Sequence, residues 1–182
     1  MKTSVTLRCS ALSAAVALAG AIAHSAEDPL PAQARATMKR STAFMRSIAT
    51  EGGYLWRYSP DLKERAGENV ATPTQIWVQP PGTPSMGIAF LRAFEVTGEP
   101  HYLDAAKAAA EALAVGQLES GGWDYLVEFD PKLSANWYRR SDVGKISAAE
   151  AAKRKNVTTF DDDNTQSALR LLLAVADASK GA

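Results

Sequence analysis

Three consecutive aspartates, Asp161 to Asp163, stand directly before an apolar run near the end of the chain. Carboxylate oxygens suit a hard divalent cation such as Ca²⁺, but acidic residues also stabilise the start of a helix. The run is not an EF-hand, because Gln166 and Leu172 stand where that motif needs glycine and glutamate. We interpret Asp161 as the helix cap. Asp162 and Asp163 are the predicted metal and substrate ligands.

Aromatic and basic residues gather in the segments between the predicted helices. Aromatic faces stack on sugars and arginine pairs with carboxylates, so this mixture favours an acidic carbohydrate ligand. The alternative is that the tryptophans only plug the ends of a helical toroid, and that Arg139 and Arg140 form a solvated surface pair. The aromatic and basic residues in question are Tyr54, Trp56, Arg57, Tyr58, Trp77, Trp123, Tyr125, Trp137 and Tyr138.

The sequence does not indicate a zinc site, a G-x-S-x-G nucleophile or a nucleotide-binding loop. The only cysteine, Cys9, lies in the N-terminal leader, and the two histidines are His24 and His101, so a zinc site is not expected. The sequence holds no G-x-S-x-G, P-loop or dinucleotide-binding motif.

The N-terminus resembles an export signal. Lys2 and Arg8 precede the apolar run 11–23, which small residues follow, so we predict a signal peptide over 1–25 and one domain over 26–182. The protein is then periplasmic or secreted, with no membrane contact after cleavage. Removal of the leader leaves 18 basic and 20 acidic residues, a net charge of −2 that does not favour nucleic-acid binding.

Apolar spacing predicts four helices, over about 32–50, 84–96, 100–117 and from the aspartates to about 179. The long segment 52–82 is rich in proline and glycine and is predicted to be irregular, with a short strand near 53–58. Residues 123–129 favour an extended conformation.

A weak repeat relates the two halves of the chain. "EGGYLWRY" (51–58) resembles "SGGWDYLVEF" (120–129), and "NVATPTQ" (69–75) resembles "NVTTFDDDNTQ" (156–166). Repeated helical units bury their apolar faces against neighbours. We therefore predict an all-α fold, an (α/α) toroid-like array of antiparallel helix pairs that is incomplete.

Several segments together resemble the pectic acid lyase family, the family 10 polysaccharide lyases. A Gly-Gly-Trp turn follows a helix at 121–123, and a Thr-aromatic-Asp-Asp-Asp run at 159–163 leads to Leu-Arg-Leu-Leu at 169–172. "ENVATPTQI" (68–76) and "EVTGEPHYLDAA" (95–106) extend the likeness, which covers about residues 45–178. The resemblance implies an (α/α) toroid-like fold and Ca²⁺-assisted β-elimination of polygalacturonate. The candidate substrate-binding residues are Asn69, Trp123, Asp162, Asp163 and Arg57.

The chain departs from the family pattern in three places. Asp161 replaces an asparagine, Glu68 replaces an aspartate beside the matching Asn69, and no arginine follows Arg170. The family's arginine base lies in a C-terminal part that has no counterpart here, so the catalytic residue is unassigned. A base must reach the proton that it removes, and only Arg57, Arg139 or Arg140 could replace it.

Three functions remain open. The chain is a secreted pectate-lyase-like enzyme, a non-catalytic or truncated carbohydrate-binding relative, or another toroid enzyme such as a prenyl cyclase. The signal peptide and the polar loops weigh against the third. An incomplete toroid would also expose apolar helix faces, which predicts marginal stability or self-association.

Overall fold

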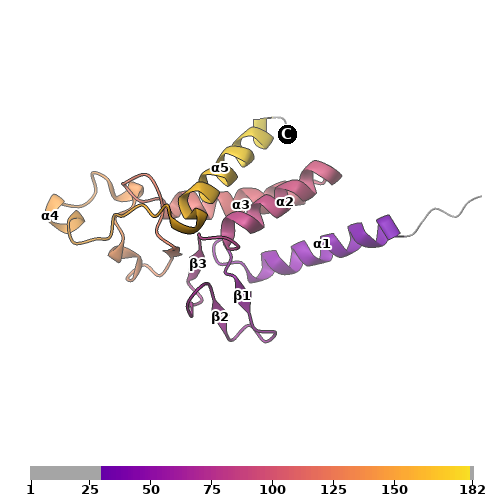
Figure 1. Ribbon diagram of the computed structural model, residues 1–182, viewed down its shortest axis with the longest axis horizontal. Helices are drawn as coiled ribbons and strands as arrows, with labels where there is room; N and C mark the ends of the chain where they lie inside the picture. The colour runs from indigo at the N-terminus through magenta and orange to yellow at the C-terminus, as the bar shows by residue number, and fades with distance from the viewer. Residues whose placement is uncertain (1–29, 181–182) are drawn as a thin grey trace, which may run out of the picture.

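The computed structural model describes residues 30–180. Four long helices occupy the positions predicted from the sequence (Figure 1), and their ends differ from the predicted ends by a few residues or fewer. They are α1 (Leu30–Ile48), α2 (Thr83–Thr97), α3 (Pro100–Gly116) and α5 (Asn164–Lys180). The shorter helical elements are η1 (Ser134–Asn136), η2 (Arg140–Asp142), α4 (Ala148–Ala151) and η3 (Asp161–Asp163).

Local sequence signals set the ends of α2 and α3. Pro84 and Pro100 each stand in the first turn of a helix, where a missing N–H costs nothing. Gly98 ends α2 in the left-handed conformation, with φ of 70°, and its N–H bonds the Phe94 carbonyl. The two helices therefore form a tight antiparallel hairpin.

The prediction of an all-α toroid is wrong. Two small antiparallel sheets accompany the helices: β1 (Arg57–Tyr58) pairs with β2 (Arg65–Ala66), and β3 (Gln75–Trp77) pairs with β4 (Leu126–Glu128). Ile76 faces Val127 in the second sheet, and both are buried. Short runs of β-branched and aromatic residues satisfy their backbone groups in a strand pair, so the fold mixes α and β structure.

The core lies where α2, α3 and α5 pack together, above the β3–β4 sheet. Alanines along α3, such as Ala106 and Ala109, are completely buried and allow close helix approach. Gly87 of α2 serves the same purpose toward α5, because a Cβ there would lie 2.3 Å from Leu171 Cδ2. The three helices form a single cluster and do not close a ring.

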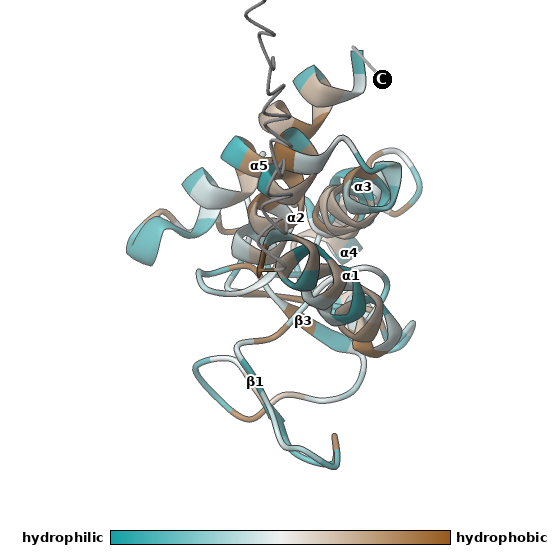
Figure 2. Ribbon diagram, turned by 90° about the vertical axis from the view of Figure 1, so that its right-hand side faces the viewer, coloured by the Kyte–Doolittle hydropathy of each residue, from teal (hydrophilic) through white to brown (hydrophobic). Residues whose placement is uncertain are grey.

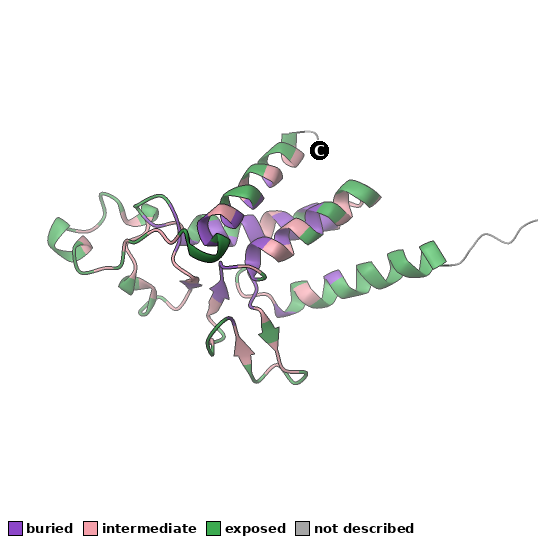
Figure 3. Ribbon diagram, in the orientation of Figure 1, coloured by how far each residue is buried: buried purple, intermediate pink, exposed green. Residues whose placement is uncertain are grey.

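Three parts project from this core. Helix α1 is exposed along most of its length, and only Thr42 and Ile48 are buried (Figure 3). The segment 131–155, which we call the arm, extends from the opposite side and carries α4 at its tip (Figure 1). The β1–β2 hairpin points away from the helices, as the end-on view in Figure 2 shows.

None of the helices within residues 30–180 is long and apolar enough to cross a membrane. The predicted signal peptide over 1–25 lies outside the described residues.

Candidate functional site

The aspartate run forms a strained turn ahead of α5. Asp161–Asp163 make a single 3₁₀ turn (η3), and Asp162 (φ 48°) and Asp163 (φ 61°) both adopt left-handed backbone conformations. Aspartate tolerates this conformation better than most residues do, but it is still costly. Asp161 does not cap α5 as we expected. Its Oδ1 accepts from the next backbone N–H, that of Asp162, at 3.0 Å.

The three carboxylates have different partners, so they point in different directions. Asp161 Oδ2 accepts from the Tyr125 hydroxyl at 3.3 Å, and Asp162 Oδ2 accepts from Gln79 Nε2 at 2.8 Å. Asp163 pairs with Arg170 on the first turns of α5. The sequence therefore places the charges side by side, while the turn separates them.

Gln79 joins the turn to the sheet. Its side chain is only 6% exposed. Gln79 Oε1 accepts from Trp77 Nε1 at 3.2 Å, and the Gln79 carbonyl accepts from Trp56 Nε1 at 2.8 Å. Because the amide oxygen is occupied by an indole donor, the amide NH₂ must face Asp162. The Asp162 carboxylate is thus held by a chain of hydrogen bonds that begins in the core.

Tyr125 lies at the centre of an acidic cluster. Burial and the neighbouring Asp161, Asp162 and Glu68 raise the pKa of its hydroxyl above the ordinary value. Glu68 comes from the loop that joins β2 to β3, so the charge of a carboxylate from a distant segment of the chain adds to that of the aspartate turn at Tyr125. We call Glu68, Asp161, Asp162 and Tyr125 the acidic cluster. At neutral pH Tyr125 is a hydrogen-bond donor in a field of negative charge.

This arrangement is not a preformed calcium site. Among the described residues, no three acidic, histidine or cysteine side chains converge as metal ligands. Asp162 would have to leave Gln79, and Asp163 would have to leave Arg170, before the two could share an ion. The metal role of Asp162 and Asp163 stays a prediction, and the residues as arranged do not fit the ion.

Trp123 does not face solvent. The ring is 0% exposed, and its Nε1 donates to the Leu113 carbonyl at 2.7 Å. The expected stacking of Trp123 on a sugar is therefore not possible in this structure. The residue instead positions the turn, because its carbonyl accepts from Thr159 N at 3.0 Å and from Asn164 Nδ2 at 3.1 Å.

Arg57 lies on β1 of the β1–β2 hairpin, and Asn69 follows Glu68 in the loop after the hairpin. Arg57 lines a cleft of about 620 Å³ whose other basic residues are Lys63 and Arg65. Within residues 30–180 its guanidinium has no hydrogen-bond or ion-pair partner. The register sets Arg57 opposite Ala66, and Tyr58 opposite Arg65, so the two arginines leave opposite faces of the ribbon.

The 66–71 loop borders both the cleft of the β1–β2 hairpin, which we call the hairpin cleft, and the acidic cluster. Ala66, Val70 and Ala71 line the hairpin cleft, and Glu68 between them reaches the acidic cluster. Asn69 is exposed in the same loop, and its carbonyl accepts from Gly67 N at 3.0 Å. The loop that holds Asn69 therefore borders the cleft lined by Arg57 and supplies Glu68 to the cluster that includes Asp162.

Sequence reasoning missed Gln79 and gave no separate role to Tyr125. Gln79 directly follows the buried run Ile76–Val78 and is itself buried. A polar side chain buried at such a place needs a specific hydrogen-bond partner. Tyr125 belongs to the loop aromatics, but nothing in the sequence shows that it meets Asp161, 36 residues away.

Comparison with known proteins does not extend these observations: no family model, curated protein or solved structure matches the chain.

Proposed function

We propose that this chain is an exported, pectate-lyase-like protein that binds polygalacturonate. The binding region consists of the acidic cluster, the 66–71 loop and the hairpin cleft. The observation that carries the proposal is the position of this loop. It borders the cleft of Arg57, which has no ion-pair partner among residues 30–180, and it supplies Glu68 to the acidic cluster.

A polyuronate offers two kinds of group to such a region. Its carboxylates match a free guanidinium, which binds them through paired hydrogen bonds. Its hydroxyls can donate to the carboxylates of Glu68 and Asp161. Half-exposed aromatic rings at Trp56 and Tyr125 add apolar surface beside these polar groups.

The reaction implied by the family resemblance is β-elimination. A base takes the proton from C5, a C4=C5 double bond forms, and the C4–O bond breaks as its oxygen receives a proton. The base needs to reach the C5 proton, and Arg57 is the candidate replacement that lies in the binding region. The other two lie in the arm: Arg139 is half-buried against Phe129 and Arg140 is exposed. No step is routed through Ca²⁺, because the carboxylates do not fit that ion as they are arranged.

Binding without catalysis is the second candidate. The specific observation in its favour is that the Tyr125 hydroxyl donates to Asp161 Oδ2 and that its pKa is raised, so Tyr125 stays protonated and is unsuited to act as a base. A prenyl cyclase is not favoured, since the clefts at this region carry charged residues.

The test is ultraviolet detection of unsaturated product from polygalacturonate, with Ca²⁺ and then with excess chelator. Wild type is compared with Arg57→Ala, Asp162→Ala and the control Asp177→Ala, an exposed carboxylate on α5. We expect product with wild type and the control, and at least a tenfold loss with Arg57→Ala. Equilibrium binding to polygalacturonate is measured in parallel.

The outcomes separate the two candidates. Binding without product, weakened by Arg57→Ala but not by Asp177→Ala, would support the non-catalytic reading. Neither binding nor product from the folded wild-type chain would overturn both. A signal that the chelator abolishes would show that the aspartate turn rearranges to accept the ion.

A further inference from the structure

The arm carries a concentration of positive charge, and helix α1, which has four basic and no acidic residues, is a second one. Residues 131–155 hold seven basic and two acidic side chains, a net charge of +5. The other described residues hold eleven basic and sixteen acidic side chains, a net charge of −5. The near-neutral total of the sequence therefore conceals two regions of opposite sign.

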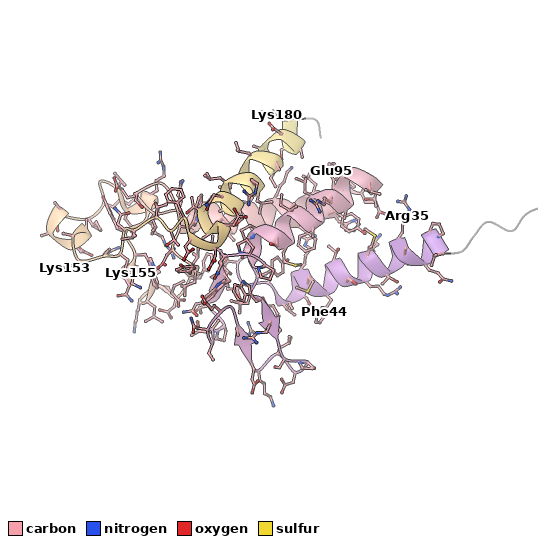
Figure 4. The ribbon with its side chains drawn as sticks, viewed as in Figure 1. Arg35, Phe44, Glu95, Lys153, Lys155 and Lys180 are labelled. Carbon is pink, nitrogen blue, oxygen red and sulfur yellow. The ribbon has the colours of Figure 1, made fainter. Side chains whose placement is uncertain are left out.

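The acidic residues of the arm do not neutralise its exposed cations. Asp142 and Glu150 both pair with Arg154. Four exposed side chains have no ion-pair partner within residues 30–180; they are Lys132, Arg140, Lys145 and Lys153. Figure 4 shows Lys153 near the tip of the arm, away from the four long helices.

The arm is held in place by backbone pairing, although it has little regular structure. Trp137 forms a bridge with Lys155, and Arg139 forms one with Leu118 at the end of α3. Glu119 N donates to the Tyr138 carbonyl at 3.0 Å, which adds a second tie to the body. The cations are therefore presented on a preorganised surface, and preorganisation lowers the entropic cost of binding.

The root of the arm adjoins the acidic cluster. Trp137 Nε1 donates to Asp124 Oδ2 at 2.7 Å, and Asp124 immediately precedes Tyr125. Lys155 lies over the Trp137 ring at 5.3 Å and within 4.0 Å of Asp124. The arm therefore starts at the segment that carries Tyr125, and a linear polymer bound at the cluster lies close to it.

We propose that the arm is a docking surface for the continuing chain of a polyuronate, with Lys132, Arg140, Lys145 and Lys153 as its anion-binding residues. This inference rests on the proposed function, since it takes the same polymer. It predicts that the protein prefers long chains to short ones. The arm attracts carboxylates through long-range charge, so its contribution falls as salt rises.

Helix α1 offers a matched control. It also carries four exposed cations and no acidic residue; they are Arg35, Lys39, Arg40 and Arg46. Replacement of either set by glutamine changes the net charge by the same amount. Only the arm is connected to the acidic cluster, and Arg35 lies on the opposite side of the molecule from Lys153 (Figure 4).

The experiment measures dissociation constants of full-length wild type, the arm variant and the α1 variant. The arm variant is Lys132→Gln/Arg140→Gln/Lys145→Gln/Lys153→Gln, and the α1 variant is Arg35→Gln/Lys39→Gln/Arg40→Gln/Arg46→Gln. The probes are polygalacturonate, trigalacturonate and a DNA duplex, each at low and high salt. Near-ultraviolet circular dichroism checks that each variant is folded.

We expect the arm variant to bind polygalacturonate about tenfold more weakly at low salt, from four surface charges of modest individual effect. Trigalacturonate affinity should change less than about twofold, and the α1 variant should resemble wild type. Equal losses in the two variants, or no loss in the arm variant, would overturn the inference and leave the proposed function standing. A wild-type chain that binds neither uronate would overturn both. Arm-dependent binding that favours DNA would show that the surface serves a different polyanion.

Discussion

The amide side chain of Gln79 is one of the contacts that tie the aspartate turn to the rest of the protein, beside those of Trp123 and Tyr125. Gln79 is buried. Its side-chain oxygen accepts a hydrogen bond from the Trp77 indole, and its side-chain nitrogen donates one to Asp162. Removal of the amide would leave both of these partners without their hydrogen bond to Gln79. The cost in folding free energy is larger than that of losing one exposed hydrogen bond. The strained backbone at Asp162 depends on the same contact, because left-handed conformations persist only where the surroundings enforce them.

Gln79→Leu should lower the free energy of unfolding by about 1–3 kcal/mol, because it leaves the Trp77 indole N–H without an acceptor. Urea denaturation followed by tryptophan fluorescence measures the change. Gln33→Leu on the exposed side of α1 is the control and should alter stability by less than about 0.5 kcal/mol. Equal effects from the two changes would show that the Gln79 network has no structural importance.

The buried phenol of Tyr54 should make the stability of the protein fall at alkaline pH. Burial raises its pKa to about 12, with smaller effects from Tyr58 and Arg46. A tyrosine in the unfolded chain titrates near 10, so the unfolded state loses its proton first as pH rises. The stability contributed by the neutral phenol is present below pH 10 and is lost between about pH 10 and 12.

Tyr54→Phe should therefore remove up to about 2–3 kcal/mol of the loss in stability between pH 9 and 12. Denaturation curves at several pH values measure this slope. Tyr138→Phe is the control, because Tyr138 is half-exposed in the arm. If the slopes of wild type and Tyr54→Phe coincide, the phenol does not titrate in the way that its burial implies.

Some elements of the fold can be predicted from local sequence, whereas others form only by pairing with distant segments of the chain. Proline starts, a glycine stop and apolar spacing make the four long helices predictable, and their bounds agree closely. The strands are two or three residues long, so they carry too little periodic signal to define a fold class. The toroid prediction failed for a related reason: the repeat suggested equivalent units, but Thr74-Gln75 leads into β3 while Thr165-Gln166 lies in α5.

At the contact between α2 and α5, replacement of a glycine by alanine should lower the stability of the protein, although the same change usually stabilises a helix. An alanine normally stabilises a helix by about 1 kcal/mol relative to glycine. Gly87→Ala should instead destabilise the protein by about 1–3 kcal/mol, because the new Cβ would lie 2.3 Å from Leu171 Cδ2.

A double-mutant cycle by urea denaturation tests the mechanism. Leu171→Ala alone should cost about 2–5 kcal/mol, since Leu171 is completely buried. The pair Gly87→Ala/Leu171→Ala should cost less than the two separate losses added together, because the clash is absent when Leu171 is shortened. Additive losses would place the strain of Gly87→Ala elsewhere.

The candidate site was predictable in part. Charge and residue type identified Asp162 and Arg57, the family resemblance added Asn69, and their role as substrate ligands stays a prediction. The same reasoning misplaced Trp123, because a Gly-Gly-Trp turn has the same sequence whether the ring faces solvent or the core. Partners such as Gln79 and Asp162 are 83 residues apart, and their pairing is a property of tertiary structure.

At the scale of the whole molecule, exposure is unevenly distributed. Helix α1 leaves the body at one side and the arm leaves at the other, while most of the burial is in α2, α3 and the start of α5 (Figure 3). Local stability should follow this distribution, since segments with few buried contacts open with little cost in free energy.

Backbone amides at 31–40 should exchange with solvent much faster than those at 102–113, because every residue from 31 to 40 is exposed and most of the α3 residues are buried. Hydrogen–deuterium exchange read by mass spectrometry measures the two peptides in one sample. Slow exchange at 31–40 would mean that α1 is covered in solution, and analytical ultracentrifugation would then test for a second copy of the chain as the cover.

The pairing of β3 with β4 also has a consequence for how the chain reaches its native state. The α2–α3 hairpin lies between these strands in sequence, so its contacts are local and can form quickly. Formation of that hairpin shortens the effective loop that β3 and β4 must close. The bond from Gln79 to Asp162 spans the hairpin, the sheet and the arm, and it belongs to the final stage of assembly. Mutations in α3 should therefore slow refolding, whereas mutations at Asp162 should mainly accelerate unfolding.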